Sequence, residues 1–142
     1  MILFFDTSAL IKRYVTESGS RKVDELFELA QNIVISPVTK IETFSTINRL
    51  LMEKVISEKN YYLLKSNIDY DFKYFEALSL NKKLQERAIE LVEKHRLKTL
   101  DSIQLAACLH RREVWSFIVS DLKLKRAAQA EGLEVIDPTE FE

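Results

Sequence analysis

Four carboxylate residues lie far apart in the sequence, but at positions where folding can bring them together. Asp6 and Asp121 each come at the end of a short apolar run that is typical of a buried strand. Asp101 opens a predicted helix, and Glu42 lies one turn into another. In an open parallel sheet, ligands bind outside the carboxyl ends of the strands, and the following helices begin at the same edge. We therefore expect these four side chains to converge.

Clustered carboxylates indicate a divalent cation, because they repel one another unless a cation or a proton intervenes. No cysteine or histidine is expected nearby, so the oxygen ligands favour a hard ion, Mg²⁺ or Mn²⁺. Such an ion suits hydrolysis of a phosphodiester, since it acidifies water and stabilises charge on the phosphoryl oxygens. We expect Asp6, Asp101 and Asp121 to hold the ion, directly or through water. Glu42 either binds it as well or positions the attacking water as a base.

Each of these residues also has a purely structural interpretation. An aspartate after a strand often caps the next helix, and a lone helical glutamate is often simply exposed. Thr7 and Ser8 directly follow Asp6, and Ser120 directly precedes Asp121. These hydroxyls either satisfy backbone donors at the helix starts or orient the acids and the water around a metal. The functional interpretation therefore depends on the joint pattern and not on any single residue.

The elements that must position these residues alternate between short apolar strands and amphipathic helices. The predicted strands cover residues 2–5, 32–36, 73–77, 115–119 and 133–136. The predicted helices cover residues 8–15, 20–30, 81–95, 101–111 and 122–130, with a long apolar helix from Pro37 to about residue 55 and another from about residue 57. Because strands alternate with helices and hairpin signals are missing, the pattern predicts a parallel sheet in an α/β fold.

Composition limits the class of protein. The 142 residues predict a single domain over 1–142, and 46% hydrophobic with 30% charged residues argues against disorder. No apolar run approaches the ~20 residues of a membrane-spanning helix. The one cysteine, Cys108, excludes an internal disulfide, and the opening residues lack a secretory signal, so we expect a cytoplasmic protein. The net charge of −1 gives no strong sign of nucleic-acid binding.

Several cations nevertheless lie within a few helical turns of the proposed acids. Any one of them is usually part of a solvated face, but together they could hold an RNA backbone. They are Lys12, Arg13, Lys40, Arg49, Lys98, Lys123, Lys125 and Arg126.

Four segments of the chain form a recognisable set: FFDTSALIKRY, PVTKIETFS, LDSIQLA and SDLKLKRAAQAEGLEVI. Together they resemble the PIN domain family, and more closely the VapC-type toxins of prokaryotic toxin–antitoxin pairs. The family's acids fall on Asp6, Glu42, Asp101 and Asp121. The sequence departs from many relatives at Lys98, where they carry arginine, and at Ser102-Ile103-Gln104, where they carry Ala-x-His.

The resemblance implies a three-layer α/β/α sandwich with a central, mainly parallel sheet of about five strands. It also implies an endoribonuclease that depends on Mg²⁺ or Mn²⁺, forms homodimers and is inhibited by a small cognate antitoxin protein. The long helix from Pro37 and the aromatic residues between 61 and 75 either supply the dimer surface or fill the core.

Other functions remain open. An aspartyl-phosphate phosphatase needs a second aspartate two positions after the nucleophile, where Ser8 stands. A phosphoacceptor receiver domain needs adjacent acids after the first strand, and Asp6-Thr7 lacks them. The remaining alternatives are a non-catalytic PIN-like protein-binding module and a PIN-domain nuclease outside a toxin–antitoxin system.

Overall fold

The computed structural model describes residues 1–141 of the chain. In this part of the chain, five parallel strands form a central sheet: β1 (Ile2–Phe5), β2 (Asn32–Ile35), β3 (Glu76–Ala77), β4 (Ser116–Ile118) and β5 (Val135–Ile136). They lie in the order β3-β2-β1-β4-β5. β1 is the middle strand, where Phe4 is in register with Val34 of β2 and Phe117 of β4.

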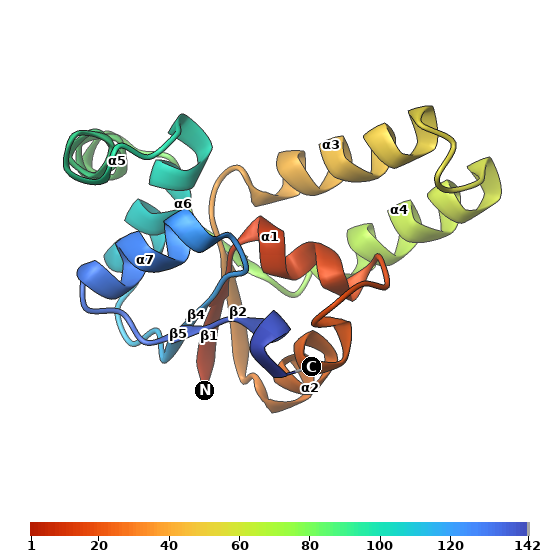
Figure 1. Ribbon diagram of the computed structural model, residues 1–142, viewed down its shortest axis with the longest axis horizontal. Coiled ribbons are helices and arrows are strands. Elements are labelled where there is room, and N and C mark those ends of the chain that lie inside the picture. The colour runs from red at the N-terminus through yellow and green to blue at the C-terminus, as the bar shows by residue number, and fades with distance from the viewer. Residues whose placement is uncertain (142) are drawn as a thin grey trace.

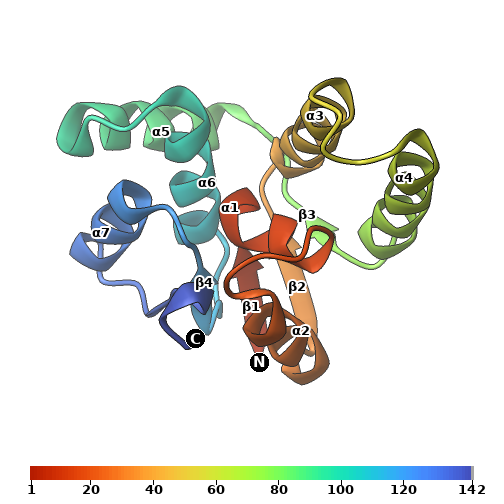
Figure 2. The same cartoon turned by 45° about the vertical axis from the view of Figure 1, so that its right-hand side comes forward.

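Helices cover both faces of this sheet (Figure 1, Figure 2). In the described part of the chain they are α1 (Thr7–Leu10), α2 (Ser20–Leu29), α3 (Thr39–Met52), α4 (Glu58–Phe72), α5 (Lys82–His95), α6 (Thr99–His110) and α7 (Leu122–Ala130), with 3₁₀ helices at Ile11–Arg13 and Pro138–Phe141. In both views α1 lies between α3 and α6. The predicted three-layer α/β/α sandwich is confirmed. None of the helices within residues 1–141 is long and apolar enough to cross a membrane.

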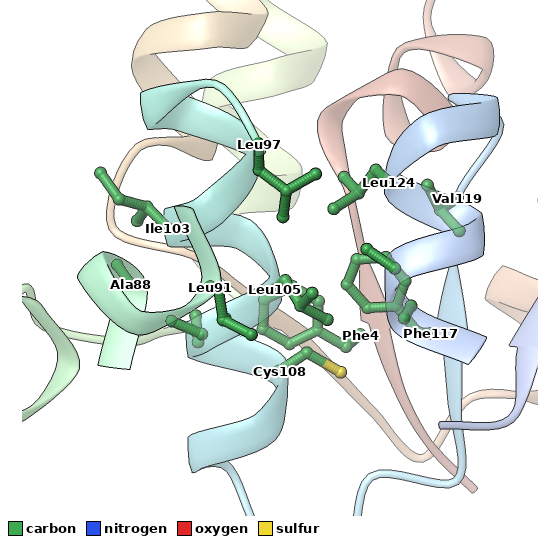
Figure 3. Close-up of a cluster of buried hydrophobic side chains, with 14 of the residues drawn as sticks. Phe4, Ala88, Leu91, Leu97, Ile103, Leu105, Cys108, Phe117, Val119 and Leu124 are labelled. Atoms are coloured by element: carbon green, nitrogen blue, oxygen red, sulfur yellow. The ribbon is translucent and has the colours of Figure 1, made fainter. Parts of the chain in front are cut away.

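One hydrophobic core fills the space between the sheet and helices α5, α6 and α7. The rings of Phe4 and Phe117 stack on this face of the sheet with their centroids 5.6 Å apart. Leu91 of α5, Leu105 of α6 and Leu124 of α7 pack over them (Figure 3). Since the three helices share this core, it fixes the starts of α6 and α7 relative to the end of β1.

A second core lies on the opposite face, because successive strand residues point to opposite sides of a sheet. Leu3 and Phe5 of β1 are fully buried there. Leu10 of α1 and Val23 of α2 pack against them. The two cores together bury β1 on both faces, as a central parallel strand requires.

Helices α3 and α4 form a two-helix arm at one side of the sheet (Figure 1). The apolar side chains of the predicted long helix are only partly buried: Ile47 is inaccessible to solvent, whereas Ile41 is 71% exposed. Met52, at the end of α3, is 73% exposed. α3 ends at Met52, so Val55 lies beyond the helix that was expected to include it. The arm therefore presents apolar side chains to solvent.

The aromatic residues after α3 divide between core and surface. Phe72 and Phe75 pack against the second core. Tyr62, Tyr70 and Tyr74 are exposed. The expectation of core filling is therefore confirmed for Phe72 and Phe75. The expectation of a dimer surface stays a prediction, to which the exposed tyrosines are open.

Three predicted elements have different boundaries in the structure. The helix expected over residues 8–15 is a four-residue α1 followed by the 3₁₀ helix Ile11–Arg13. The strand expected over 73–77 is confined to Glu76–Ala77, because α4 continues through Phe72 and the backbone N–H of Tyr74 bonds to Asp71. Asp101 does not open α6, because the extended residue that precedes the helix is Lys98.

α7 covers the predicted residues, Leu122–Ala130, and Gly132 terminates it. Gly132 has φ +87°, a left-handed conformation that glycine adopts without a Cβ clash. Its N–H donates to the carbonyl of Gln129, and the N–H of Leu133 donates to that of Ala128, at 3.0 and 3.1 Å. This is the Schellman arrangement that turns the chain toward β5.

Glu131, the last residue before this turn, ties α7 to α5. Its buried carboxylate accepts hydrogen bonds from Lys94 and His95 at 2.7 Å and from Arg87 at 2.9 Å. These donors, with Lys94 the strongest, lower the pKa of Glu131 to about 2. Three basic side chains of one helix thus converge on a single acid of another.

We expect Glu131→Gln to lower the free energy of unfolding at pH 7 by about 1.5–3 kcal/mol, the range for hydrogen bonds to a charged group. Because the folded state lowers the pKa, this stabilisation is complete above the ordinary glutamate value of 4.5 and is lost as pH falls toward about 2. Urea denaturation of both proteins from pH 7 to pH 3 measures it. Glu86→Gln, at an exposed position of α5, is the control; an equal loss in both variants would contradict the assignment.

Candidate active site

Ser8 connects the two aspartates that follow β1 and β4. The backbone N–H of Asp6 donates to the carbonyl of Ile118 at 2.9 Å, so the ends of the two strands are adjacent. The hydroxyl of Ser8 donates to Oδ2 of Asp6 at 2.5 Å. The same hydroxyl accepts from the backbone N–H groups of Ser120 and Asp121, at 3.0 and 3.3 Å. One side chain therefore fixes the start of α1 to the loop that precedes α7.

Asp6 and Asp121 also cap the helices that follow them. Oδ2 of Asp6 accepts the N–H of Ser8 at 3.0 Å, and Oδ1 of Asp121 accepts the N–H of Leu124 at 2.8 Å. Each carboxylate keeps its other oxygen free of hydrogen bonds within residues 1–141. The capping interpretation is therefore correct for both residues, and it leaves one oxygen of each for a ligand.

Glu42 is held by two donors from different elements. Oε1 of Glu42 accepts the hydroxyl of Thr7 and the Nε2 amide of Gln104, both at 2.8 Å. The amide of Gln104 also donates to the hydroxyl of Thr7 at 3.0 Å. Thr7 begins α1, Glu42 lies in the first turn of α3 and Gln104 lies on α6. This triangle fixes the position of Glu42 relative to the end of β1.

Gln104 is the functional residue that the sequence reasoning missed. It is fully buried (0% exposed), and its hydrogen bonds join α1, α3 and α6. The sequence analysis mentions it only as a position where many relatives carry the histidine of Ala-x-His. One signal was available: Gln104 follows Asp101 by three residues, a spacing that places both on one face of a helix. A polar side chain in an otherwise apolar helical stretch needs a partner, and that partner is Glu42.

Asp101 is the least constrained of the four acids. It lies in the first turn of α6 and makes no side-chain hydrogen bond to any other residue that the structure describes. Burial raises its pKa, and the carboxylates of Asp121 and Glu42 raise it further, whereas Lys98 and Lys123 act in the opposite direction. Asp101 therefore interacts electrostatically with two other predicted site residues, Asp121 and Glu42.

Asp6 is the most buried acid, with 4% of its surface exposed. Burial raises its pKa from 3.8 to about 7, against the lowering effect of its two hydrogen bonds from Ser8. The carboxylates of Glu42 and Asp101 raise it further. A nearby cation would act in the opposite direction, because it favours the ionised form of the Asp6 carboxyl group.

All four predicted acids line one open pocket of about 550 Å³, as do Thr7 and Ser8. Ser120 does not line it. Its hydroxyl is buried without a hydrogen-bond partner among the described residues, and it contacts the site through its backbone N–H to Ser8. The pocket wall is completed on the α1 and α3 sides by residues that include Glu17 and Arg49.

The oxygen donors suit a hard cation, although the side chains are not arranged around one. Across residues 1–141, no three histidine, cysteine or acidic side chains form a group that could hold a metal ion. Glu42 resembles Asp6 and Asp121 in that one of its oxygens has no hydrogen bond to another described residue. The chemistry of the donors therefore fits Mg²⁺ or Mn²⁺. Binding would require rotation of the side chains, and Asp101 is the freest to rotate.

Comparison with known proteins identifies both a family and a fold. A family model described as the PIN domain matches residues 3–130. No curated protein matches the sequence.

Several solved structures share the fold across nearly the whole chain. A toxin–antitoxin complex from Klebsiella pneumoniae contains a chain with 22% identity and a TM-score of 0.68, with 96% of this chain and 97% of that chain covered. FitAcB from Neisseria gonorrhoeae gives 16% identity and a TM-score of 0.70, with 97% and 98% covered. VapC20 from Mycobacterium tuberculosis, a sarcin–ricin loop cleaving toxin, gives 15% identity and a TM-score of 0.68, with 92% and 95% covered.

The contacts of Gln104 generate a prediction on stability. Gln104→Leu removes a buried donor from both Glu42 and Thr7, so we expect the free energy of unfolding to fall by about 1–3 kcal/mol. Gln129→Leu makes the same change at an exposed position of α7 and should stay within about 0.5 kcal/mol of the wild type. Urea denaturation at pH 7 compares them; indistinguishable midpoints would show that the Gln104 contacts contribute nothing.

Proposed function

The chain belongs to the PIN domain family, and on that premise we propose that it is a Mg²⁺- or Mn²⁺-dependent endoribonuclease and the toxin of a toxin–antitoxin pair. The observation that carries this proposal is that four acids from four separate segments, Asp6, Glu42, Asp101 and Asp121, line one pocket. The raised pKa values of Asp6 and Asp101 support it: burial is the main cause in both, and the neighbouring carboxylates raise the two pKa values further.

The free carboxylate oxygens of Asp6, Asp101 and Asp121 are the groups that would hold the ion, with Glu42 as a possible fourth ligand. A divalent ion there supplies positive charge beside the phosphoryl oxygens and makes water more acidic. An ion held there would favour the ionised form of the Asp6 carboxyl group. Ser8 keeps Oδ2 of Asp6 in place throughout, because its N–H and hydroxyl both donate to that atom.

Glu42 is the residue that we propose to receive the proton of the attacking water. Its Oε1 is occupied by Thr7 and Gln104, which leaves Oε2 to accept that proton. As the water oxygen bonds to phosphorus, the bond from phosphorus to the leaving oxygen of the RNA strand breaks in line with it. The two fixed donors prevent Glu42 from turning away and orient Oε2 before the substrate binds.

The names of structural neighbours support the assignment as a toxin. They include a toxin–antitoxin complex and a toxin that cleaves the sarcin–ricin loop. A FitAB complex bound to a DNA fragment is also similar, with a TM-score of 0.75 over the whole of this chain. We infer by this likeness that the chain binds a cognate antitoxin protein and acts in the cytoplasm.

We expect Asp6→Asn to abolish cleavage of structured RNA by the purified protein in Mn²⁺, because the variant cannot supply a charged ligand. Glu42→Gln should slow cleavage by about 10²–10⁴-fold, the usual contribution of a general base. Asp69→Asn, at an exposed aspartate of α4, should cleave at the wild-type rate. Full activity of Asp6→Asn would disprove the proposed site.

Thermal unfolding provides a readout of the same site that does not depend on RNA. Mn²⁺ at about 100 times its dissociation constant should stabilise the wild type by about 2.7 kcal/mol, as any ligand of the native state does. The double variant Asp6→Asn/Asp101→Asn should lose this response, and Asp69→Asn should retain it. An unchanged response in the double variant would place the ion elsewhere.

We also propose that the protein is a homodimer. The exposed apolar residues of the α3–α4 arm, Ile41, Met52, Val55, Tyr62 and Leu63, offer a surface for a second copy. Met52→Glu should then shift the solution mass toward a monomer, as measured by sedimentation at micromolar concentration. A wild-type protein that is monomeric under these conditions would contradict the proposed dimer, and would leave the chemistry of the pocket unaffected.

A further inference from the structure

A second pocket, of about 640 Å³, adjoins the acid pocket on the side of α5 and α7. Its lining includes His95, Lys123 and Arg126. Asp121 lines both pockets, so the two are neighbours across that residue. A ligand bound at the acids can therefore extend into this second pocket without crossing another element.

Four cations lie on this side and form what we call the cationic rim: Arg96, Lys98, Lys123 and Arg126. Nζ of Lys123 donates to the backbone carbonyl of Arg96 at 2.7 Å, which places the start of α7 against the end of α5. Lys98 and Lys123 both interact with the charge of Asp101. Arg126 lies one turn after Lys123 and lines the same pocket. The rim therefore runs along the border of the acid pocket.

The rim cations lack carboxylate partners. No salt bridge within residues 1–141 includes any of the four. Glu131, which ends α7 on the α5 side, already accepts hydrogen bonds from Arg87, Lys94 and His95. The positive charge of the rim is therefore available to a ligand.

The opposite side of the acid pocket differs, because its cations are paired within the chain. Lys12 pairs with Glu17 at 2.9 Å, and Arg49 pairs with Glu53 at 3.6 Å. Of the eight cations near the acids in sequence, the structure thus leaves only Lys98, Lys123 and Arg126 without an ion pair in its described part. Positive charge is therefore distributed unevenly around the acid pocket. The cations without an ion pair lie on the α7 side.

We propose that the cationic rim binds the phosphodiester backbone of the RNA strand next to the phosphate that is cleaved. This inference rests on the proposed nuclease function. It places the part of the RNA next to the cleaved phosphate on the α5 and α7 side of the acid pocket. Lys and Arg side chains bind phosphates without reading the bases, so the rim contributes affinity and orientation and no sequence preference. An acidic protein segment is the other polyanion that such a surface could attract.

Salt dependence of binding tests the rim without cleavage. A fluorescent single-stranded RNA is titrated with protein in EDTA at 50–200 mM NaCl, and anisotropy gives the association constant. Each phosphate contact on a single strand contributes about 0.7 to the slope of log K against log salt. We expect Lys123→Gln/Arg126→Gln to reduce the slope by about 1.4, and Arg126→Gln alone by about 0.7.

The control is Lys59→Gln/Lys65→Gln, which makes the same charge change at two exposed lysines of α4 and should keep the wild-type slope. The guanidinium of Arg126 takes part in no ion pair within residues 1–141, so its single variant tests the rim without removing a salt bridge from the fold. A slope unchanged in both rim variants, or lowered equally by the control, would overturn the proposal. Competition by polyglutamate at lower concentrations than by unlabelled RNA would overturn it in favour of an acidic protein partner.

Cleavage of the same RNA in Mn²⁺ separates this inference from the function on which it rests. A wild type that cleaves, together with rim variants that bind normally, contradicts only the rim. A wild type that binds with the expected slopes but never cleaves supports the rim and contradicts the nuclease.

Discussion

The burial of one carboxylate at the end of the central strand is the constraint around which the site is arranged. A buried acid needs hydrogen bonds, a proton or a cation, because the unpaired charge is strongly disfavoured in a low dielectric. Asp6 receives two hydrogen bonds from Ser8, yet burial and the neighbouring acids still raise its pKa to about 7. A cation bound in the pocket would offset this penalty, because it favours the ionised carboxylate.

Two polar side chains transmit this constraint to the rest of the molecule. Ser8 joins the ends of β1 and β4 through Asp6 and the N–H groups that precede α7. Gln104 joins α1, α3 and α6 through Thr7 and Glu42. Because the cores beneath these helices are closely packed, the donors and acceptors meet at fixed positions, and the pocket owes its shape to both cores.

The sequence predicts those parts of the fold and site that depend on local pattern. Asp6 and Asp121 were located because each ends a short apolar run, and the sheet places both runs in adjacent strands. Asp101 was expected to begin its helix, but α6 begins at Thr99, directly after Lys98. No side chain within residues 1–141 caps this helix, so the sequence carries no capping residue that marks its start. The role of Gln104 and the unpaired state of the rim depend on contacts between residues many tens of positions apart, which periodicity and spacing do not encode.

The bridge from Ser8 to Asp121 spans 113 residues of the chain. During translation, α1 and the first strand emerge long before the segment that supplies Asp121 and α7. A nascent polypeptide therefore carries an incomplete pocket until most of its length has left the ribosome. The pocket is therefore a property of the whole domain and not of any local segment of the chain.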